Sequence, residues 1–129
     1  MGEPGLEGWS DGDVLSHAII DALLGATGLG DIGEHFPSST VDEGISSLEL
    51  LRRTRDLIRD WRVINVDSTV ILEKRKLAPH RDRMRSNIAE ALGLDPADVS
   101  VKATTPDGLG ALGRSEGVGA VATAQVEKR

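Results

Sequence analysis

One segment organises the first third of this chain: Trp9-Ser10-Asp11-Gly12-Asp13-Val14-Leu15-Ser16-His17, followed by an apolar run that stops at Leu29-Gly30-Asp31-Ile32-Gly33. Ser10 or Asp11 can cap the start of a helix here, and acidic residues in a first turn interact favourably with the helix dipole. Helical spacing of the apolar residues predicts a buried stripe, formed by Val14, Ala18, Ile19, Ala22 and Leu23. The glycines that follow are expected to end the helix.

The rest of the chain builds a small mixed fold around this helix. Residues 1–8 are predicted to form a flexible arm, which leaves one domain over residues 9–129. Beyond the first helix we expect a helix capped by Ser46 or Ser47, a strand over 63–72, a helix over 79–92, and strands over 98–103 and 118–126. This order indicates the α/β class, of the α+β type, with a small mixed sheet packed on helices. Such a sheet leaves an open edge, which favours pairing with another chain.

The composition narrows the range of functions. With 129 residues the chain is one domain, and with 2% aromatic residues its core is expected to be aliphatic. A net charge of −6 argues against nucleic-acid binding, although it allows one anionic ligand in a local pocket. The sequence has no cysteine, no apolar run of membrane-spanning length and no basic leader, so we expect a cytoplasmic protein without membrane contact.

Three side chains on the first helix have the spacing of a cation site. Asp13, His17 and Asp21 are four residues apart, so they lie on one side of the helix. Imidazole suits Zn or Mn, and carboxylates suit Mg or Mn. The alternative is that the carboxylates cap or solvate the helix and that His17 is partly buried. From these residues alone the second interpretation is the more common one, and both stay open.

Two further groups have the chemistry of a ligand site. Asp31-Ile32-Gly33 offers a carboxylate and free backbone N–H groups that can bind the hydroxyls of a polyol, although from these residues alone a simple turn is the more common explanation. Thr104 and Thr105 end a predicted strand before a glycine-rich loop, where hydroxyls and N–H groups commonly hold phosphate oxygens. Two β-branched residues that merely finish a strand are the alternative.

The order of these motifs resembles a known family. The second half of the chain adds Asn65-Val66-Asp67, Val101-Lys102-Ala103-Thr104-Thr105, Gly108-Leu109-Gly110 and Gly113-Arg114-Ser115-Glu116-Gly117. With the two N-terminal segments, these motifs resemble the 2-C-methyl-D-erythritol 2,4-cyclodiphosphate synthase family from about Glu3 to the C-terminus. The resemblance implies a mixed α/β subunit that forms a homotrimer around a central apolar channel. It also implies active sites between subunits, with the helix around His17 on one side and the neighbour's cytidine-binding loop on the other.

The resemblance also implies a reaction, that of a phosphorus–oxygen lyase in isoprenoid (terpenoid) biosynthesis. The 2-phosphate of 4-diphosphocytidyl-2-C-methyl-D-erythritol 2-phosphate attacks the β-phosphorus of the cytidine diphosphate group, which gives a cyclic diphosphate and CMP. The implied cofactor is a divalent metal, Zn, Mg or Mn, and the implied partner is the small cytidine-diphosphate substrate. His17, together with Asp13, is the expected metal ligand, and Thr105 and Ser10 are the expected catalytic residues.

The remaining site residues are carried over by position. Asp31, Ile32 and Gly33 would contact the methylerythritol part of the substrate, Thr105 would polarise the phosphate under attack, and Arg114 would supply positive charge near the diphosphate. Lys76 matches a lysine of the cytidine-binding loop, although a charged connector between strand and helix explains it from composition alone. The other expected substrate contacts are Trp9, Ser10, Phe36, Thr104, Asp107 and Ala111.

The sequence departs from the family pattern at several positions. Trp9 stands where the family usually has His, Asp107 where Glu is usual, and Ala111 where Phe is usual. The family's opening Asp-x-His strand, with two of its three metal ligands, has no counterpart here, and neither do the two acidic residues of its flexible loop. Three interpretations follow: a cyclase, a family member that binds a nucleotide or diphosphate without this chemistry, or a structural partner in a trimer.

Overall fold

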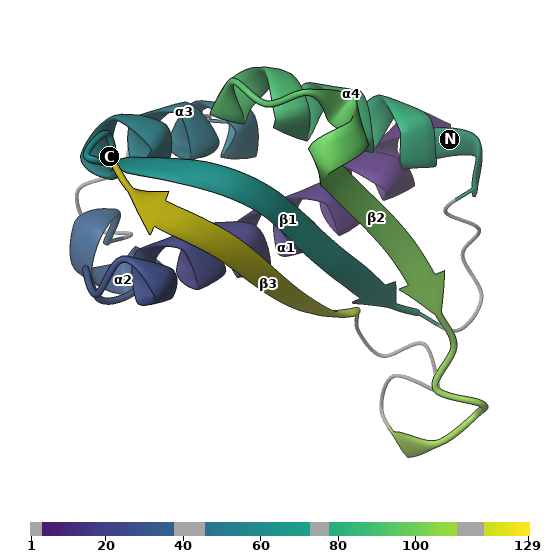
Figure 1. The fold of residues 1–129 in the computed structure, drawn as a ribbon. Coiled ribbons are helices and arrows are strands. Elements are labelled where there is room, and N and C mark those ends of the chain that lie inside the picture. The colour runs from purple at the N-terminus through teal and green to yellow at the C-terminus, as the bar shows by residue number, and fades with distance from the viewer. Residues whose placement is uncertain (1–3, 38–45, 73–77, 111–117) are drawn as a thin grey trace.

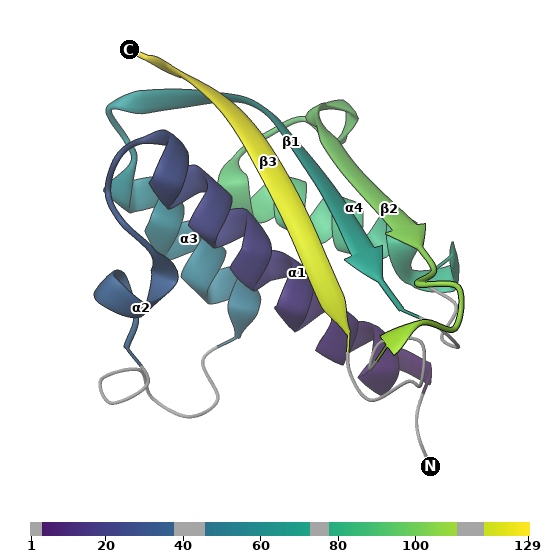
Figure 2. The same ribbon diagram turned by 90° about the horizontal axis from the view of Figure 1, so that it is seen from below.

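The chain folds into a layer of helices on one face of a small sheet (Figure 1 and Figure 2). The computed structural model describes residues 4–37, 46–72, 78–110 and 118–129, and for residues 4–11 and 78 it describes the backbone alone. Helix α1 (Pro4–Ala26) packs against the strands β3 (Gly119–Lys128) and β1 (Trp61–Ile71). Helix α4 (Ala78–Leu92) packs against the strand β2 (Val99–Thr104). Helix α3 (Ser47–Leu57) contacts both α1 and α4. The expected mixed α/β architecture is confirmed.

The sheet has the strand order β2-β1-β3. The central strand β1 (Trp61–Ile71) runs parallel to β2 (Val99–Thr104) and antiparallel to β3 (Gly119–Lys128). Val66 pairs with both neighbours, and the register to β3 shifts between Val63 and Asn65. Within the described residues β2 and β3 both leave one edge unpaired, which agrees with the expected open edge.

The helix boundaries confirm some predictions and correct others. Ser46 caps α3, because its side chain accepts a hydrogen bond from the Glu49 N–H. Helix α1 begins at Pro4, so residues 4–8, expected in a flexible arm, are helical. Proline is well suited to a first helical turn, a signal that the interpretation of a glycine-rich arm overlooked. Two short elements were not predicted: α2 (Ile32–His35) and the 3₁₀ helix η1 (Pro96–Asp98).

The core is aliphatic, as the composition predicts. Its fully buried members include Leu15, Ile19, Ile20, Leu23 and Leu24 of α1 and Val66 and Val70 of β1. The predicted stripe on α1 was partly wrong, because Val14, Ala18 and Ala22 are only half-buried. The helix buries its larger leucine and isoleucine side chains instead, which remove more apolar surface from water.

The sheet face away from the helices is partly polar. Side chains alternate between the two faces of a strand, so the buried Val66, Ser68 and Val70 face the helices and Asp67 and Thr69 face away. On this outer face the Lys102 ammonium lies 2.9 Å from the Asp67 carboxylate, and Val121 is exposed. No helix among the described residues is long and apolar enough to cross a membrane.

Candidate functional site

The Asp31-Ile32-Gly33 segment forms the start of the short helix α2. Asp31 is the N-cap, and its Oδ1 accepts the Glu34 N–H at 3.0 Å. The Ile32 N–H donates to Asp21 Oδ1 of helix α1 at 2.7 Å. The expectation that this tripeptide offers free N–H groups is therefore wrong for Ile32, because the first orphan donor of the helix is already satisfied within the chain.

Further contacts hold the same segment in place. His35 Nε2 lies 2.7 Å from the Leu29 carbonyl oxygen, and the Phe36 N–H donates to the Ile32 carbonyl at 2.8 Å. The side chains of Ile32 and Phe36 pack, half-buried, against the core. Gly30 has φ +99, a left-handed conformation that favours glycine, and it brings the chain round into α2. The Asp31 carboxylate is thus presented on a segment fixed by both backbone and side-chain contacts.

The candidate metal ligands on α1 do not form a three-ligand site. Asp13 Oδ1 accepts the Ser47 hydroxyl at 2.6 Å, Asp21 binds the Ile32 N–H, and His17 is exposed. Across the part of the chain that the structure describes, no three His, Cys, Asp or Glu side chains are grouped so that they could hold an ion. A zinc site of the expected kind needs three protein ligands, so the described residues do not fit it.

Trp9 and Ser10, the other candidates on this helix, lie in its N-terminal part. The structure describes their backbone, which is helical, and their expected contacts with substrate remain predictions. The i, i+4 spacing that predicts one face for Asp13 and His17 holds, because both belong to the regular helix α1.

The Thr104–Asp107 segment forms a tight corner at the carboxyl end of β2. The Thr104 carbonyl accepts the Leu72 N–H at 3.1 Å, which fixes the strand end beside β1. Thr105 Oγ1 accepts the Asp107 N–H at 3.1 Å. Asp107 has φ +56, which is uncommon for a residue with a side chain but tolerated by Asp. A hydroxyl has one donor and two lone pairs, and the Asp107 N–H occupies one of the lone pairs of Thr105.

The structure does not bring all the candidates together within one chain. Helix α2, with Asp31 at its start, lies at one end of the molecule, and the carboxyl ends of β1 and β2 lie at the other (Figure 1 and Figure 2). Asp31 and Thr105 are therefore far apart in the subunit. The predicted contacts at Lys76, Ala111 and Arg114 lie outside the described residues.

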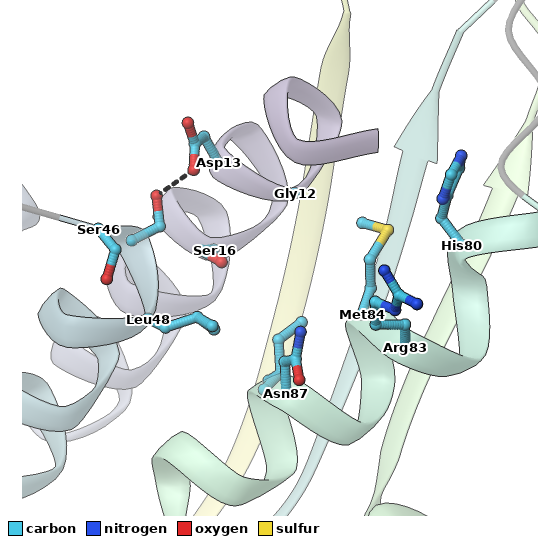
Figure 3. A pocket seen from close by; sticks show the side chains of 11 residues that line it. Gly12, Asp13, Ser16, Ser46, Leu48, His80, Arg83, Met84 and Asn87 are labelled. Carbon is cyan, nitrogen blue, oxygen red and sulfur yellow. Dashed lines mark hydrogen bonds between the residues drawn. The ribbon is translucent and has the colours of Figure 1, made fainter. Parts of the chain in front are cut away.

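A cavity of about 260 Å³ between α1, α3 and α4 was not predicted from the sequence. Figure 3 shows Ser16 of α1 and Met84, Arg83 and Asn87 of α4 around it, with the Asp13–Ser47 hydrogen bond at its edge. His80, Arg83 and Asn87 recur at i, i+3 and i+7, a spacing that could have placed them on one face of α4.

The chain is similar to known proteins in both sequence and overall fold. Residues 1–127 match the model of the YgbB family. The chain is 53% identical to the 2-C-methyl-D-erythritol 2,4-cyclodiphosphate synthase of Syntrophomonas wolfei over 127 residues, which is 96% of this chain and 81% of the relative. Bifunctional IspDF from Campylobacter jejuni superposes with a TM-score of 0.86 at 39% identity, over 90% of this chain and 32% of that one.

A second solved structure is IspF of Plasmodium falciparum, determined as a CDP complex. It superposes with a TM-score of 0.78 at 31% identity, over 90% of this chain and 71% of that one. The order of the sequence motifs, the mixed sheet under its helices and these similarities lead to one conclusion: the chain belongs to the YgbB family.

Proposed function

We propose that this chain is a subunit of a 2-C-methyl-D-erythritol 2,4-cyclodiphosphate synthase, which converts 4-diphosphocytidyl-2-C-methyl-D-erythritol 2-phosphate into the cyclic diphosphate and CMP. The observation that carries the proposal is the 53% identity to the Syntrophomonas wolfei synthase over 96% of this chain. The CDP bound to the Plasmodium falciparum relative supports a cytidine-diphosphate ligand. The Asp31 cap and the Thr104–Asp107 corner supply oxygen and hydroxyl groups suited to the two ends of that substrate.

The proposed chemistry exchanges one phosphorus–oxygen bond for another. An oxygen of the 2-phosphate forms a bond to the β-phosphorus while the bond from that phosphorus to the CMP oxygen breaks, and the electron pair leaves with CMP. The protein's task is therefore orientation and stabilisation of negative charge. In this proposal Asp31 and Gly33 hold the polyol, Thr105 donates its hydroxyl hydrogen to the phosphate under attack, and Arg114 adds positive charge near the diphosphate. Ser10 acts as a further catalytic residue in this proposal, and Lys76 belongs to the loop that binds the cytidine.

The proposal includes assembly into a homotrimer with shared sites. Asp31 and Thr105 lie at opposite ends of one subunit, so a single substrate reaches both only where two copies meet. The unpaired edges of β2 and β3 and the outer sheet face around Val121 offer surface for such contacts. A closed ring with head-to-tail contacts places the two ends of neighbouring subunits together. Light scattering of the purified protein should give three times the chain mass of 13.7 kDa.

A direct turnover assay tests the function. Purified protein is incubated with 4-diphosphocytidyl-2-C-methyl-D-erythritol 2-phosphate, with Mg, Mn or Zn and separately with EDTA, and mass spectrometry follows CMP and the cyclic product. We expect both products in equal amounts, their loss in Asp31→Ala, and no change in Glu90→Ala, whose side chain is exposed on α4. Binding of CDP without any turnover would contradict the synthase and favour a family member that binds the ligand only.

A further inference from the structure

Asp21 joins the helix of the candidate metal ligand to the segment expected to bind the polyol. It lies on α1 four residues after His17, one helical turn further along the same face. Its Oδ1 accepts the Ile32 N–H at 2.7 Å, a short distance for a hydrogen bond between an amide and a carboxylate. Ile32 is the first residue of α2 and the middle residue of Asp31-Ile32-Gly33. One side chain therefore connects the two parts of the site that α1 and α2 contribute.

Three other polar contacts described for this segment are local. Asp31 binds the Glu34 N–H, His35 binds the Leu29 carbonyl, and Phe36 binds the Ile32 carbonyl. All three bonds join residues within 29–36, so they fix the internal shape of the segment. The Leu29 N–H, which donates to the Leu24 carbonyl at 2.8 Å, ties the first residue of this range to α1 but leaves the orientation of α2 to other contacts. Apolar packing of Ile32 and Phe36 against the core restrains that position without defining a direction. The Asp21 bond adds a directional contact to helix α1 itself.

A carboxylate is well suited to the position of Asp21, beside the Ile32 N–H at the start of α2. The first N–H groups of a helix have no partner within the helix, and the partial positive charge there favours an anion. Asp31 satisfies the Glu34 N–H from inside the segment, and Asp21 satisfies the Ile32 N–H from outside it. The two carboxylates therefore have different roles. Asp31 has one oxygen in the cap, whereas Asp21 has one oxygen in the link between helices.

We propose that Asp21 is a positioning residue: by accepting the Ile32 N–H it holds Asp31 and Gly33 where they bind the polyol end of the substrate. The inference rests on the proposed function for the identity of that substrate. Without the Asp21 carboxylate, the segment spends part of its time away from the binding position. The apparent affinity for substrate then falls in proportion to the fraction of molecules in which the segment is in the binding position. A substrate that is already bound still reacts at the same rate. The signature is a raised KM and substrate Kd with an unchanged kcat.

Two variants and one control separate this role from a general loss of stability. Asp21→Ala removes the acceptor, and Asp21→Asn keeps an acceptor oxygen but removes the charge. Glu90→Ala is the control, since Glu90 is also an exposed acidic residue on a helix. Amide hydrogen exchange at Ile32, followed by NMR on the full chain, reports the bond directly and needs no activity. Exchange at Val66, in the central strand, reports global opening of the fold.

The expected result follows from the usual strength of such a bond. We expect Asp21→Ala to accelerate exchange at Ile32 about three- to tenfold, with no change at Val66. The substrate Kd, measured by calorimetry in EDTA, and the KM should rise by a similar factor, with a smaller rise in Asp21→Asn. Unchanged exchange at Ile32 in Asp21→Ala would overturn the inference, and so would faster exchange with the same Kd and KM.

The two proposals fail in distinguishable ways. A wild-type protein that binds the substrate but does not convert it contradicts the proposed function, while the Kd values of the Asp21 variants still decide the inference. A wild-type protein that neither binds nor converts the substrate contradicts both the synthase function and the positioning role of Asp21, because the Asp31-Ile32-Gly33 segment then does not bind the polyol. A matched fall in kcat and in global stability across the Asp21 variants would show a structural role and contradict positioning.

Discussion

Asp31 and Thr105 lie at opposite ends of the same subunit, one at the start of α2 and the other just beyond β2. Both have local reasons for their conformation: Asp31 caps a helix and Thr105 accepts the Asp107 N–H. Neither of these local contacts places Asp31 near Thr105. If both act on one substrate, the polyol end and the phosphate end must be bound by different copies of the chain.

The hydroxyl of Thr105 should matter more for activity than for folding. Thr105→Val has nearly the same shape but loses the hydroxyl, and we expect kcat/KM to fall about 100-fold, as for other single donors to a developing negative charge. Thr105→Ser keeps the hydroxyl and should stay within about threefold of the wild type. Steady-state kinetics of both variants test this expectation. Equal kcat/KM values for the Val and Ser variants would show that the Thr105 hydroxyl has no catalytic role.

Gly93 should not tolerate a side chain. It ends α4 with φ +70, and an added Cβ would lie 2.8 Å from Cζ of Arg55. The Arg55 side chain is exposed and can move, so most of the cost comes from the left-handed backbone. We expect Gly93→Ala to lower the free energy of unfolding by about 1–2 kcal/mol, measured by urea denaturation.

Gly25 provides the matched control for this substitution. It lies near the end of α1 and an added Cβ would meet nothing within 4 Å. Because alanine restricts the unfolded chain more than glycine does, Gly25→Ala should stabilise the protein by about 0.5–1 kcal/mol. A similar effect of both substitutions, in either direction, would contradict the structural account of Gly93.

The hydrogen bond from Ser47 to Asp13 should couple helices α3 and α1. Its length is 2.6 Å and both side chains are at the surface. A double-mutant cycle with Ser47→Ala and Asp13→Ala should give a coupling free energy of about 0.5–1.5 kcal/mol in urea unfolding. The pair Ser46→Ala and Asp13→Ala is the control, since Ser46 binds Glu49 instead, and its coupling should be near zero. Additive effects in the first cycle would mean that the bond does not form in solution.

The elements of the fold could be predicted from local signals, because they depend on neighbours in the sequence. The Ser46 cap, the β-branched run of β1 and the glycine after α4 each gave the correct element. The start of α1 was missed, because residues 2, 5 and 8 are glycines and glycine usually weakens a helix. The buried face of α1 was predicted one position out of phase, because the tertiary packing partners decide which of two adjacent apolar stripes is covered.

The candidate site was harder to predict for the same reason. The chemical types of residues such as Asp31 and Thr105 can be read from the motifs, but the separation of these residues depends on the direction of helices and strands across the whole subunit. The Asp21–Ile32 bond spans eleven residues and has no periodic signature. The cluster of Asp13, His17 and Asp21 was expected as one possible cation site, and the structure uses both carboxylates for hydrogen bonds within the chain.

Activity of mixed assemblies tests the account most directly. Asp31→Ala and Thr105→Ala chains, each inactive alone, are denatured, mixed in equal amounts and refolded together, and CMP release is compared with wild type treated in the same way. In a ring whose sites take Asp31 from one chain and Thr105 from the next, random mixing should restore about a quarter of the wild-type rate. A mixture that remains as inactive as its parents, with mixed assemblies detected by mass spectrometry, would contradict a site shared between copies.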